Sequence, residues 1–314
     1  MPEPQPPPPR APSPSGPAWM TYAPALFLLL WSSGFVFLKL GLAYADPLTF
    51  LALRYACVVT LVGLAYAWLR PALPATPRTW MHLALVGLFL QAGYFAFTYL
   101  SLKFGLSAGA VALITSQQPI LVGLLAPLLA GERVGLRHWA GLLLGVAGAG
   151  LVILAKSSIG TASAAGLLFA VLALLSIVAG TLWEKRYGSD THPLTANLVQ
   201  YSVGLAVSAP LALWLEPMHI DWAPGLFGSL AYLVLCNSLI AITLLLAMIR
   251  HGKASRVSAL FFLVPPTTAI IAFLVLGETI PPLAWPGMLL AVAGIYLVMR
   301  RHPCPASLAK PERQ

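Results

Sequence analysis

Long apolar stretches, separated by short polar connections, run through almost the whole chain. Each stretch is close to the ~20 residues that a helix needs to cross a ~30 Å hydrocarbon core. Lipid offers no partners to backbone polar groups and the sequence lacks a barrel-type alternation, so we expect an all-α membrane protein with ten transmembrane helices. The expected helices span residues 22–43, 47–69, 80–101, 106–130, 137–155, 164–184, 194–215, 225–249, 254–276 and 283–299.

The apolar pattern occurs twice. Residue n and residue n + 146 match along nearly the whole hydrophobic length without a gap. Apolar composition alone would align Leu with Ala but not the rarer residue types, so the match indicates duplication. Each copy holds five spans, and an odd number of crossings places the second copy upside down in the bilayer, as in many secondary transporters. The matched pairs include Gly34 and Gly180, Lys39 and Lys185, Tyr55 and Tyr201, Trp68 and Trp214, and Trp139 and Trp285.

We therefore predict two inverted five-helix repeats, residues 20–156 and 157–301. Residues 1–19 are rich in Pro and nearly free of large apolar side chains, so we expect a disordered cytoplasmic tail there, with a second tail at residues 302–314. With 59% hydrophobic and 9% charged residues and a mean hydropathy of +0.85, the chain has too little polar surface for a water-soluble domain. The short connections leave no room for a soluble catalytic domain.

Basic residues give the expected orientation. With a cytoplasmic amino terminus, 14 of the 18 Lys and Arg residues face the cytoplasm; the other four are Lys103 and Lys156 in outer loops and Lys39 and Arg54 inside spans. This asymmetry follows the positive-inside rule and predicts that both termini face the cytoplasm. The net charge of +9 therefore requires no nucleic-acid partner.

Enzyme signatures are weak. Residues 105–109 satisfy the GxSxG pattern, but that motif requires a strand-turn-helix setting and this stretch opens a membrane helix. The six histidines lie in loops, tails or span ends, and Cys57, Cys236 and Cys304 lack metal-binding spacing. We expect no enzyme activity, no cofactor and no metal site.

Two amides define the first candidate site. Gln91, halfway along the third span, corresponds by the 146-residue shift to Asn237, halfway along the eighth. In inverted repeats the substrate binds near the midplane between the copies, and two carboxamides at equivalent depth can bind one polar or zwitterionic solute. The alternative is that each amide joins its helix to a neighbour.

Polar and aromatic residues flank two further helix breaks. The fourth span carries Thr115, Ser116, Gln117 and Gln118 directly before Pro119, which frees nearby carbonyl groups. The ninth span repeats the break at residues 265–266 but places Phe261 and Phe262 where the fourth has Thr115 and Ser116. One polar and one aromatic wall would suit an amphipathic solute, with Thr115, Gln118, Phe261 and Phe262 as contacts. The alternative is a pair of packing kinks.

Trp31 and Ser32 lie at the centre of the first span, and Tyr94 lies one turn from Gln91. A Trp far from the interfacial belt needs a partner for its N–H group, which a cavity can supply, although ordinary packing is the alternative. Arg54 lies roughly 10 Å along the second span. A cation at that depth is a candidate for binding a substrate carboxylate or phosphate.

Lys39 lies nearer the outer end of its span, where snorkelling or pairing with Asp46 is expected instead. The repeat also distinguishes the two cations. Lys39 corresponds to Lys185, whereas Arg54 corresponds to the neutral Gln200. The two copies therefore differ in charge at the position of Arg54.

Several motifs together resemble the EamA family of the drug/metabolite transporter superfamily, over roughly residues 22–300. They are the run Trp31-Ser32-Ser33-Gly34-Phe35 followed by Lys39, then Pro47, Arg54-Tyr55, Pro119, Gly131-Glu132-Arg133 and a Gly-rich fifth span, echoed by Pro193, Pro265 and Gly277-Glu278-Thr279. The resemblance implies the drug/metabolite transporter-like fold. In that fold, helices 1–4 and 6–9 surround a central cavity, helices 5 and 10 lie outside it, and one repeat rocks against the other in alternating access.

Members of that family often export amino acids or related compounds, and the resemblance implies a multi-pass protein of the bacterial cytoplasmic (inner) membrane. We therefore expect a secondary transporter that exports a small organic metabolite, with an amino acid or derivative favoured. The alternatives are a broad exporter of amphipathic drugs and a membrane sensor or scaffold without transport. The expected partners are a small-molecule substrate and membrane lipid, and the sequence leaves the oligomeric state open.

Overall fold

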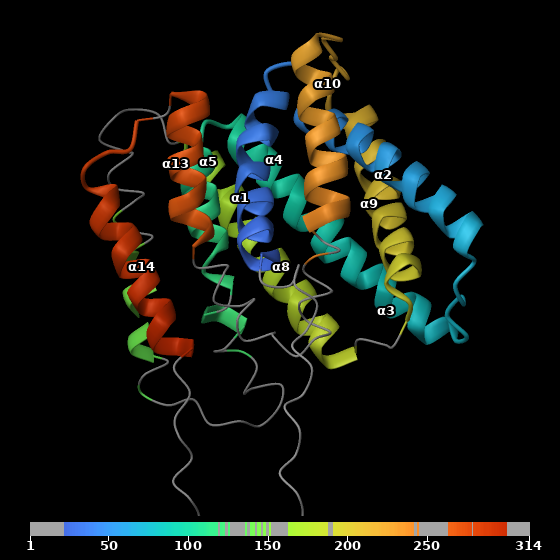
Figure 1. Cartoon of the computed structure of the whole chain (residues 1–314), viewed down its shortest axis with the longest axis horizontal. Helices are drawn as coiled ribbons and strands as arrows, with labels where there is room; N and C mark the ends of the chain where they lie inside the picture. Colours follow the sequence, from blue (N-terminus) through green and yellow to red (C-terminus); the bar gives the residue numbers. More distant parts are fainter. Residues whose placement is uncertain are drawn as a thin grey trace, which may run out of the picture.

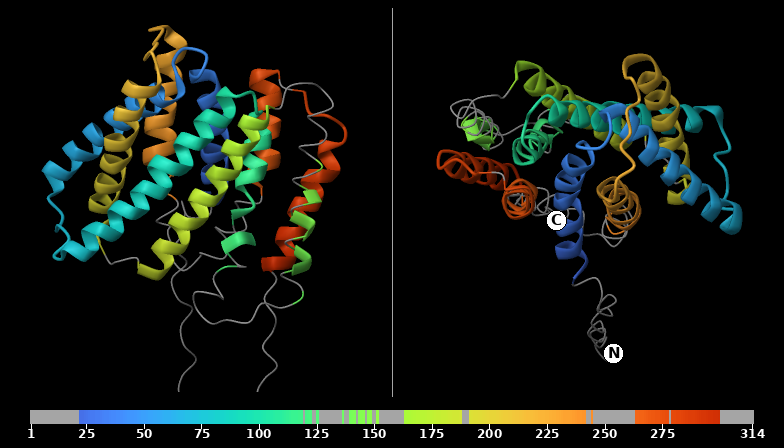
Figure 2. Two further views of the ribbon diagram at one scale, coloured as in Figure 1. Left: turned by 180° about the vertical axis from the view of Figure 1, so that it is seen from behind. Right: turned by 90° about the horizontal axis from the view of Figure 1, so that it is seen from above.

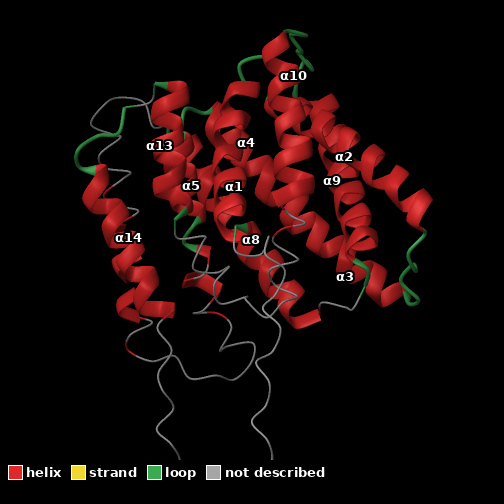
Figure 3. Cartoon of the chain, in the orientation of Figure 1, coloured by secondary structure: helices red, strands yellow, loops and turns green. Residues whose placement is uncertain are grey.

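A computed structural model describes residues 22–118, 120–122, 125, 136, 139–141, 143–145, 147–148, 151, 163–187, 191–241, 244, 263–277 and 279–299. All regular secondary-structure elements among these residues are helices (Figure 3). The only β pairing among them is an isolated bridge between Ala45 and Ile220. The all-helical prediction is therefore confirmed for the described part of the chain. The predicted tails lie outside it.

The helices of the first copy follow the predicted order. They are α1 (Ala23–Gly41), α2 (Pro47–Leu69), a continuous third span made of α3 (Pro77–Gly87), η2 (Leu88–Tyr94) and α4 (Phe95–Lys103), and α5 (Ala108–Thr115). Those of the second copy are α8 (Ala164–Tyr187), α9 (Pro193–Leu215), α10 (Pro224–Ala231) continued by η3 (Tyr232–Ala241), α13 (Val264–Leu276) and α14 (Ala284–Met299).

Six helical segments in the described part are long and apolar enough to cross a membrane. They are Ala23–Gly41, Pro47–Leu69, Pro77–Lys103, Ala164–Glu184, Pro193–Leu215 and Pro224–Ala241. These segments correspond to the first three predicted spans of each copy. The fourth and fifth predicted spans of the first copy, residues 106–130 and 137–155, lie only partly within the described residues.

Local sequence signals explain where the helices begin and end. Pro47 and Pro193 open α2 and α9, because a proline at the first helical position removes an N–H group that would lack a partner there. The Ser107 hydroxyl caps α5 by accepting a bond of 3.2 Å from the N–H of Ala110. Gly277 ends α13 in the left-handed conformation, with φ of 63°.

The helices of one copy pack against helices of the other, and the main contacts have counterparts when the two copies are interchanged. The two second spans, α2 and α9, pack against each other. The first span of each copy packs on the third span of the other, so α1 contacts α10 and η3 while α8 contacts α3, η2 and α4 (Figure 1). Likewise α1 contacts α13 and α8 contacts α5. The duplication read from the sequence is thus also a symmetry of the packing.

Both third spans contain a π-helical segment at matching positions. The segment η2 covers Leu88–Tyr94 and η3 covers Tyr232–Ala241, and the 146-residue shift carries the first into the second. Gln91 and Asn237 lie inside these segments. Short π-helical segments are rare and are frequent at functional sites, so their presence in both copies directs attention to this level of the bundle.

The last helix, α14, lies at the edge of the bundle (Figure 2). A Cβ atom placed on Gly294 would stand 2.5 Å from the carbonyl oxygen of Gly141 and 2.7 Å from the backbone nitrogen of Gly145. Glycines at such positions allow the backbones of two membrane helices to approach closely. The structure adds that the contact is made within one chain.

Aromatic side chains also mark the outer surface. Trp68 and Trp214, a matched pair near the ends of α2 and α9, are 84% and 80% exposed. Tyr55, Tyr99 and Tyr201 are instead fully buried among the helices. Exposed Trp at helix ends is typical of side chains that meet the membrane interface.

Candidate functional site

Two small cavities lie side by side between the copies and share the side chains of Trp31, Phe35 and Tyr94 as a common wall. Each has a volume of about 20 Å³. That volume holds about one water molecule. Each cavity alone is therefore smaller than an organic metabolite.

The first cavity contains the only buried cation among the described residues, Arg54, which is 1% exposed. Residues of both copies form the cavity, because α1, α2 and the third span of the first copy meet η3 of the second. The described residues around it are Trp31, Gly34, Phe35, Leu38, Arg54, Tyr94, Phe95, Thr98, Leu233 and Asn237.

Hydrogen bonds hold the Arg54 guanidinium across the two copies. Its Nη2 donates to Asn237 Oδ1 at 2.9 Å and to Ser238 Oγ at 2.8 Å, and its Nε donates to the same hydroxyl at 3.2 Å. Its Nη1 donates to the Tyr99 hydroxyl at 3.2 Å, and its Cζ lies 4.7 Å from the centre of the Phe95 ring. All of these partners are neutral.

Gly34 allows Asn237 to reach Arg54. A Cβ atom at Gly34 would stand 2.4 Å from Asn237 Nδ2 and 3.0 Å from Asn237 Cγ. Such distances are too short for any real side chain. The absence of a side chain at residue 34 therefore positions the amide that faces the guanidinium.

The second cavity is uncharged. The described residues around it are Trp31, Phe35, Tyr94, Ala112, Thr115, Ser116, Gln118, Ile177 and Val264. Its polar side is the end of α5, where the helix stops at Thr115. The Ser116 hydroxyl and the Gln117 amide both donate to the Leu113 carbonyl, at 2.7 and 3.1 Å.

The break predicted before Pro119 is thus present, and nearby side chains replace part of the missing helical bonding. Gln118 reaches across to the second copy and donates from Nε2 to the Thr181 hydroxyl at 2.7 Å. Pro119 itself, like Phe261 and Phe262, lies outside the described residues. The aromatic wall proposed for the ninth span stays a prediction.

Most of the predicted site residues surround these cavities. Trp31 and Tyr94 border both cavities, Arg54 and Asn237 border the first, and Thr115 and Gln118 border the second; Ser32 and Gln91 border neither. Ser32 is buried in α1 and its carbonyl accepts a bond from the Thr268 hydroxyl at 3.2 Å.

Gln91 faces a different neighbour from Asn237. The Tyr55 hydroxyl donates to the Gln91 carbonyl at 2.6 Å and lies 3.2 Å from its side-chain oxygen. Across the helix pair, Gly204 of α9 would place a Cβ atom 2.8 Å from Gln91 Cβ. The structure therefore gives Gln91 the contacts of the helix-joining alternative, while Asn237 faces the first cavity.

Several cavity residues were missed from the sequence. Phe35 and Leu38 lie one and two turns after Trp31, and Thr98 lies one turn after Tyr94. Helical periodicity from these aromatic residues would have found them, because residues three, four and seven apart share a face. Leu233 lies one turn before Asn237, and Ser116 belongs to the polar run at residues 115–118, so both also carried a signal.

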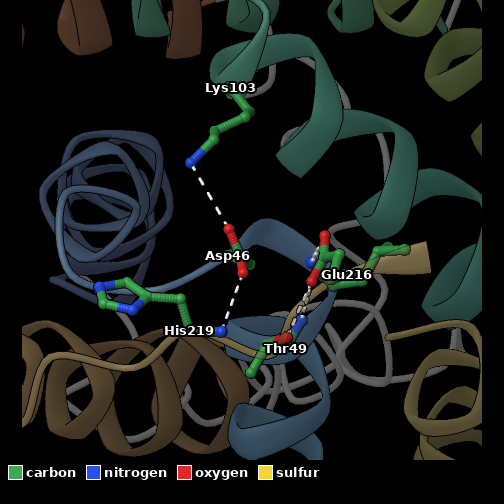
Figure 4. A network of polar contacts seen from close by, with 6 residues as sticks. Asp46, Thr49, Lys103, Glu216 and His219 are labelled. Atoms are coloured by element: carbon green, nitrogen blue, oxygen red, sulfur yellow. Dashed lines mark hydrogen bonds and ion pairs between the residues drawn. The ribbon is translucent and has the colours of Figure 1, made fainter. Parts of the chain in front are cut away.

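A junction of polar contacts closes one end of the bundle (Figure 4). The Asp46 carboxylate accepts from the His219 backbone N–H at 2.9 Å and forms an ion pair of 3.8 Å with Lys103. The Glu216 carboxylate accepts from the backbone N–H groups of Leu48 and Thr49 at 2.9 and 2.8 Å. This junction joins the loop after α1 to the loop after α9.

The chemistry available around the cavities is one cation, several hydroxyl and amide groups and aromatic faces. The described residues contain no group of three or more His, Cys, Asp or Glu side chains arranged to hold a metal ion. These groups can bind and orient a small polar molecule. They contain no paired nucleophile and base.

The chain is similar to proteins that are named as exporters of amino acids or their metabolites. A probable amino-acid metabolite efflux pump of Salmonella typhimurium is 27% identical over 284 residues, which cover 87% of this chain and 92% of that protein. A probable terminal-alkyne amino-acid exporter of Streptantibioticus cattleyicolor is 29% identical over 202 residues, which cover 62% of this chain and 65% of that protein.

A solved crystal structure with 19% sequence identity has a similar fold, with a TM-score of 0.64 over 88% of this chain and 95% of that chain. The EamA-like transporter family matches the chain twice, over residues 18–154 and 164–300. These two segments coincide with the copies related by the 146-residue shift. The chain therefore belongs to the EamA-like transporter family and is a multi-pass membrane transport protein.

Proposed function

We infer that the protein exports a small organic metabolite, an amino acid or a close derivative, across the cytoplasmic membrane by alternating access. The observation that carries this proposal is the pair of cavities between the two copies, where Arg54 of one copy meets Asn237 of the other at 2.9 Å. A site formed by both copies changes shape when one moves against the other. The efflux-pump and exporter names of the relatives support the direction and the substrate class.

The proposed topology is ten helices in two inverted repeats. The junction in Figure 4 supports it, because the first connection of one copy, at Asp46, meets the second connection of the other, at His219. In a parallel arrangement of five-helix copies, these connections would lie on opposite membrane faces. In Figure 1, α1 begins and α14 ends at the same end of the bundle, in agreement with cytoplasmic termini.

The conformation with cavities of about 20 Å³ then corresponds to an occluded state. Aromatic stacks join the copies toward both ends. Phe37 of α1 stacks on Tyr232 of η3 with ring centres 3.8 Å apart, and His82 of α3 stacks on Tyr187 of α8 at 4.9 Å. In the proposed cycle, one stack separates while the other stays closed, so that the cavities open to one side at a time.

Transport can be tested in two steps. Metabolites in the medium are compared between cells that produce the protein and cells that lack it, and each enriched compound is then tested for flux in proteoliposomes. We expect one or a few amino-acid-like compounds to accumulate outside and to cross the liposome membrane. Normal excretion together with absence of flux for every compound would refute the proposal and favour a sensor or scaffold.

A further inference from the structure

The Arg54 guanidinium has an unusual set of partners for a cation buried between membrane helices. It has five N–H groups. Four of them bond to Ser238, Asn237 and Tyr99, and one N–H of Nη1 has no acceptor among the described residues. Two of the four used N–H groups share a single hydroxyl, that of Ser238. The bonding capacity of the guanidinium is therefore incompletely used.

The charge of Arg54 is also unbalanced. Among the described residues, no Asp or Glu forms an ion pair with it; the ion pair between Lys103 and Asp46 involves other groups at the end of the bundle. Buried charges in proteins are usually paired, because neutral dipoles compensate the loss of hydration incompletely. A negative group that enters the first cavity would complete the site.

A second buried polar group faces the same cavity. Thr98 is 1% exposed, and within the described part of the chain its hydroxyl makes no hydrogen bond of ordinary geometry; the Tyr94 hydroxyl is its nearby polar neighbour. The Thr98 hydroxyl and an Arg54 N–H border the same cavity, so together they offer two hydrogen-bond donors to one bound group. A carboxylate, with two acceptor oxygens, matches this pair.

The neighbouring cavity is different in chemistry. The described residues that surround it, which include Thr115, Gln118, Ile177 and Val264, carry no charge. The shared aromatic wall of Trp31 and Tyr94 separates a cationic compartment from a neutral one. A molecule that occupies both would carry its negative group at one end and an uncharged portion at the other.

We propose that Arg54 is the carboxylate-binding residue of the transported molecule, so that the protein accepts anions or zwitterions and rejects cations that lack a carboxylate. This proposal rests on the proposed transport function and specifies its substrate class. The carboxylate bonds to Nη1 of Arg54 and to the Thr98 hydroxyl, and the remainder of the molecule enters the cavity beside Thr115. Asn237 and Ser238 hold the guanidinium in position.

The test compares acids with their amides on the purified full-length protein. Isovalerate, L-leucine and L-phenylalanine are each titrated into the protein, and so are the corresponding amides isovaleramide, L-leucinamide and L-phenylalaninamide. Thermal unfolding is the readout. We expect at least one acid to raise the unfolding temperature, with a half-saturating concentration at least tenfold below that of its amide. Equal response to acid and amide, or no response to any acid, overturns the proposal.

Variants identify the residue. Arg54→Gln is expected to abolish the preference for the acid, and Arg54→Lys, which keeps the positive charge, to retain part of it. Arg186→Gln, which removes an exposed arginine of α8, serves as the matched control and keeps the wild-type preference. An Arg54→Gln protein that folds and still prefers the acid contradicts the assignment. If this variant does not fold, the comparison of acid and amide on the wild type decides.

Flux measurements separate this proposal from the transport function. Proteoliposomes are loaded in parallel with the acids, the amides and isoamylamine. Flux of the acids alone supports both proposals. Flux of the amides or of isoamylamine at the same rate overturns carboxylate recognition but leaves transport intact, whereas absence of all flux and all binding overturns both.

Discussion

Thr49 and Thr195 occupy equivalent positions, and the hydroxyl of each donates a hydrogen bond to the region where the second span of the other copy ends. Thr49 Oγ1 donates to the Glu216 carboxylate at 2.8 Å, and Thr195 Oγ1 donates to the Ala72 carbonyl at 3.3 Å. The two threonines lie in the first turns of α2 and α9, which pack against each other. Threonines at equivalent positions thus join the copies at two places, one to a charged acceptor and the other to a neutral acceptor.

The difference between these two junctions predicts a stability effect. Glu216 accepts three bonds at the start of α2, from two backbone N–H groups and the Thr49 hydroxyl. A negative group there also interacts favourably with the helix dipole. We expect Glu216→Ala to lower the free energy of unfolding by about 1–2 kcal/mol, since it removes a helix cap and its charge-assisted bonds.

Thermal unfolding in detergent measures this effect. Asp221→Asn is the matched control, because it neutralises an exposed carboxylate in the same loop, and the hydrogen bonds of Asp221 to Tyr44 and Ala223 are made by its backbone. The control should unfold at the wild-type temperature. A wild-type unfolding temperature for Glu216→Ala would exclude the capping contact.

A second prediction concerns the space between α1 and η3. Gly34→Ala places a methyl group 2.4 Å from Asn237 Nδ2, so the amide must move and its bond to Arg54 is lost. A hydrogen bond to a charged group contributes ~1.5–3 kcal/mol, so we expect transport to fall about tenfold with insertion unchanged. Gly63→Ala is the control, since a Cβ atom there meets nothing within 4 Å. Equal flux in the two variants would contradict the positioning of Asn237 by Gly34.

The fold was largely predictable because hydrophobic length and duplication act over many residues. The predicted second span, 47–69, has the bounds of α2, and the predicted seventh, 194–215, differs from α9 by one residue. The π-helical segments could not be predicted, since no proline or other local signal distinguishes Leu88–Tyr94 from an ordinary helix. Both segments pack against helices of the other copy, η2 against α8 and α9 and η3 against α1 and α2, and these contacts are not readable from the local sequence.

The residue types of the site were predictable, but the neighbours that their side chains face were not. Arg54 and Asn237 were selected by depth and repeat position, and the structure brings them to 2.9 Å. Gln91 was selected by the same reasoning, yet it contacts Tyr55 instead. The sequence gives the position of a residue along a helix, whereas the rotation of that helix in the bundle determines which neighbour its side chain meets.

That difference gives a third prediction. Gln91→Ala leaves the 2.6 Å bond from the Tyr55 hydroxyl to the backbone carbonyl intact but removes the side-chain oxygen 3.2 Å from that hydroxyl, together with the buried side-chain atoms beyond Cβ. We expect a loss of ~1–2 kcal/mol in unfolding free energy and an unchanged half-saturating substrate concentration. Asn237→Ala should instead raise that concentration, because Arg54 Nη2 loses an acceptor. Transport kinetics and thermal unfolding of both variants separate the two effects, and the reverse outcome would show that Gln91 binds substrate.

The last prediction concerns the closed end of the bundle. Asp46 holds the loop after α9 through the His219 N–H at 2.9 Å, beside the bridge between Ala45 and Ile220. Loss of this acceptor should favour the conformation open at that end. The Lys103 ion pair, with a side chain 46% exposed and a separation of 3.8 Å, should contribute little, because solvent and salt screen it.

Cysteine labelling tests this difference. In a background without the native cysteines, Ile220→Cys is expected to react several-fold faster with an impermeant maleimide when combined with Asp46→Ala, and at nearly the original rate when combined with Lys103→Met. Trp222→Cys, at a position 59% exposed in the same loop, controls for general accessibility and should react equally in all three proteins. Acceleration at both cysteines would indicate local unfolding of the loop, and no acceleration at residue 220 would show that Asp46 does not keep this end closed.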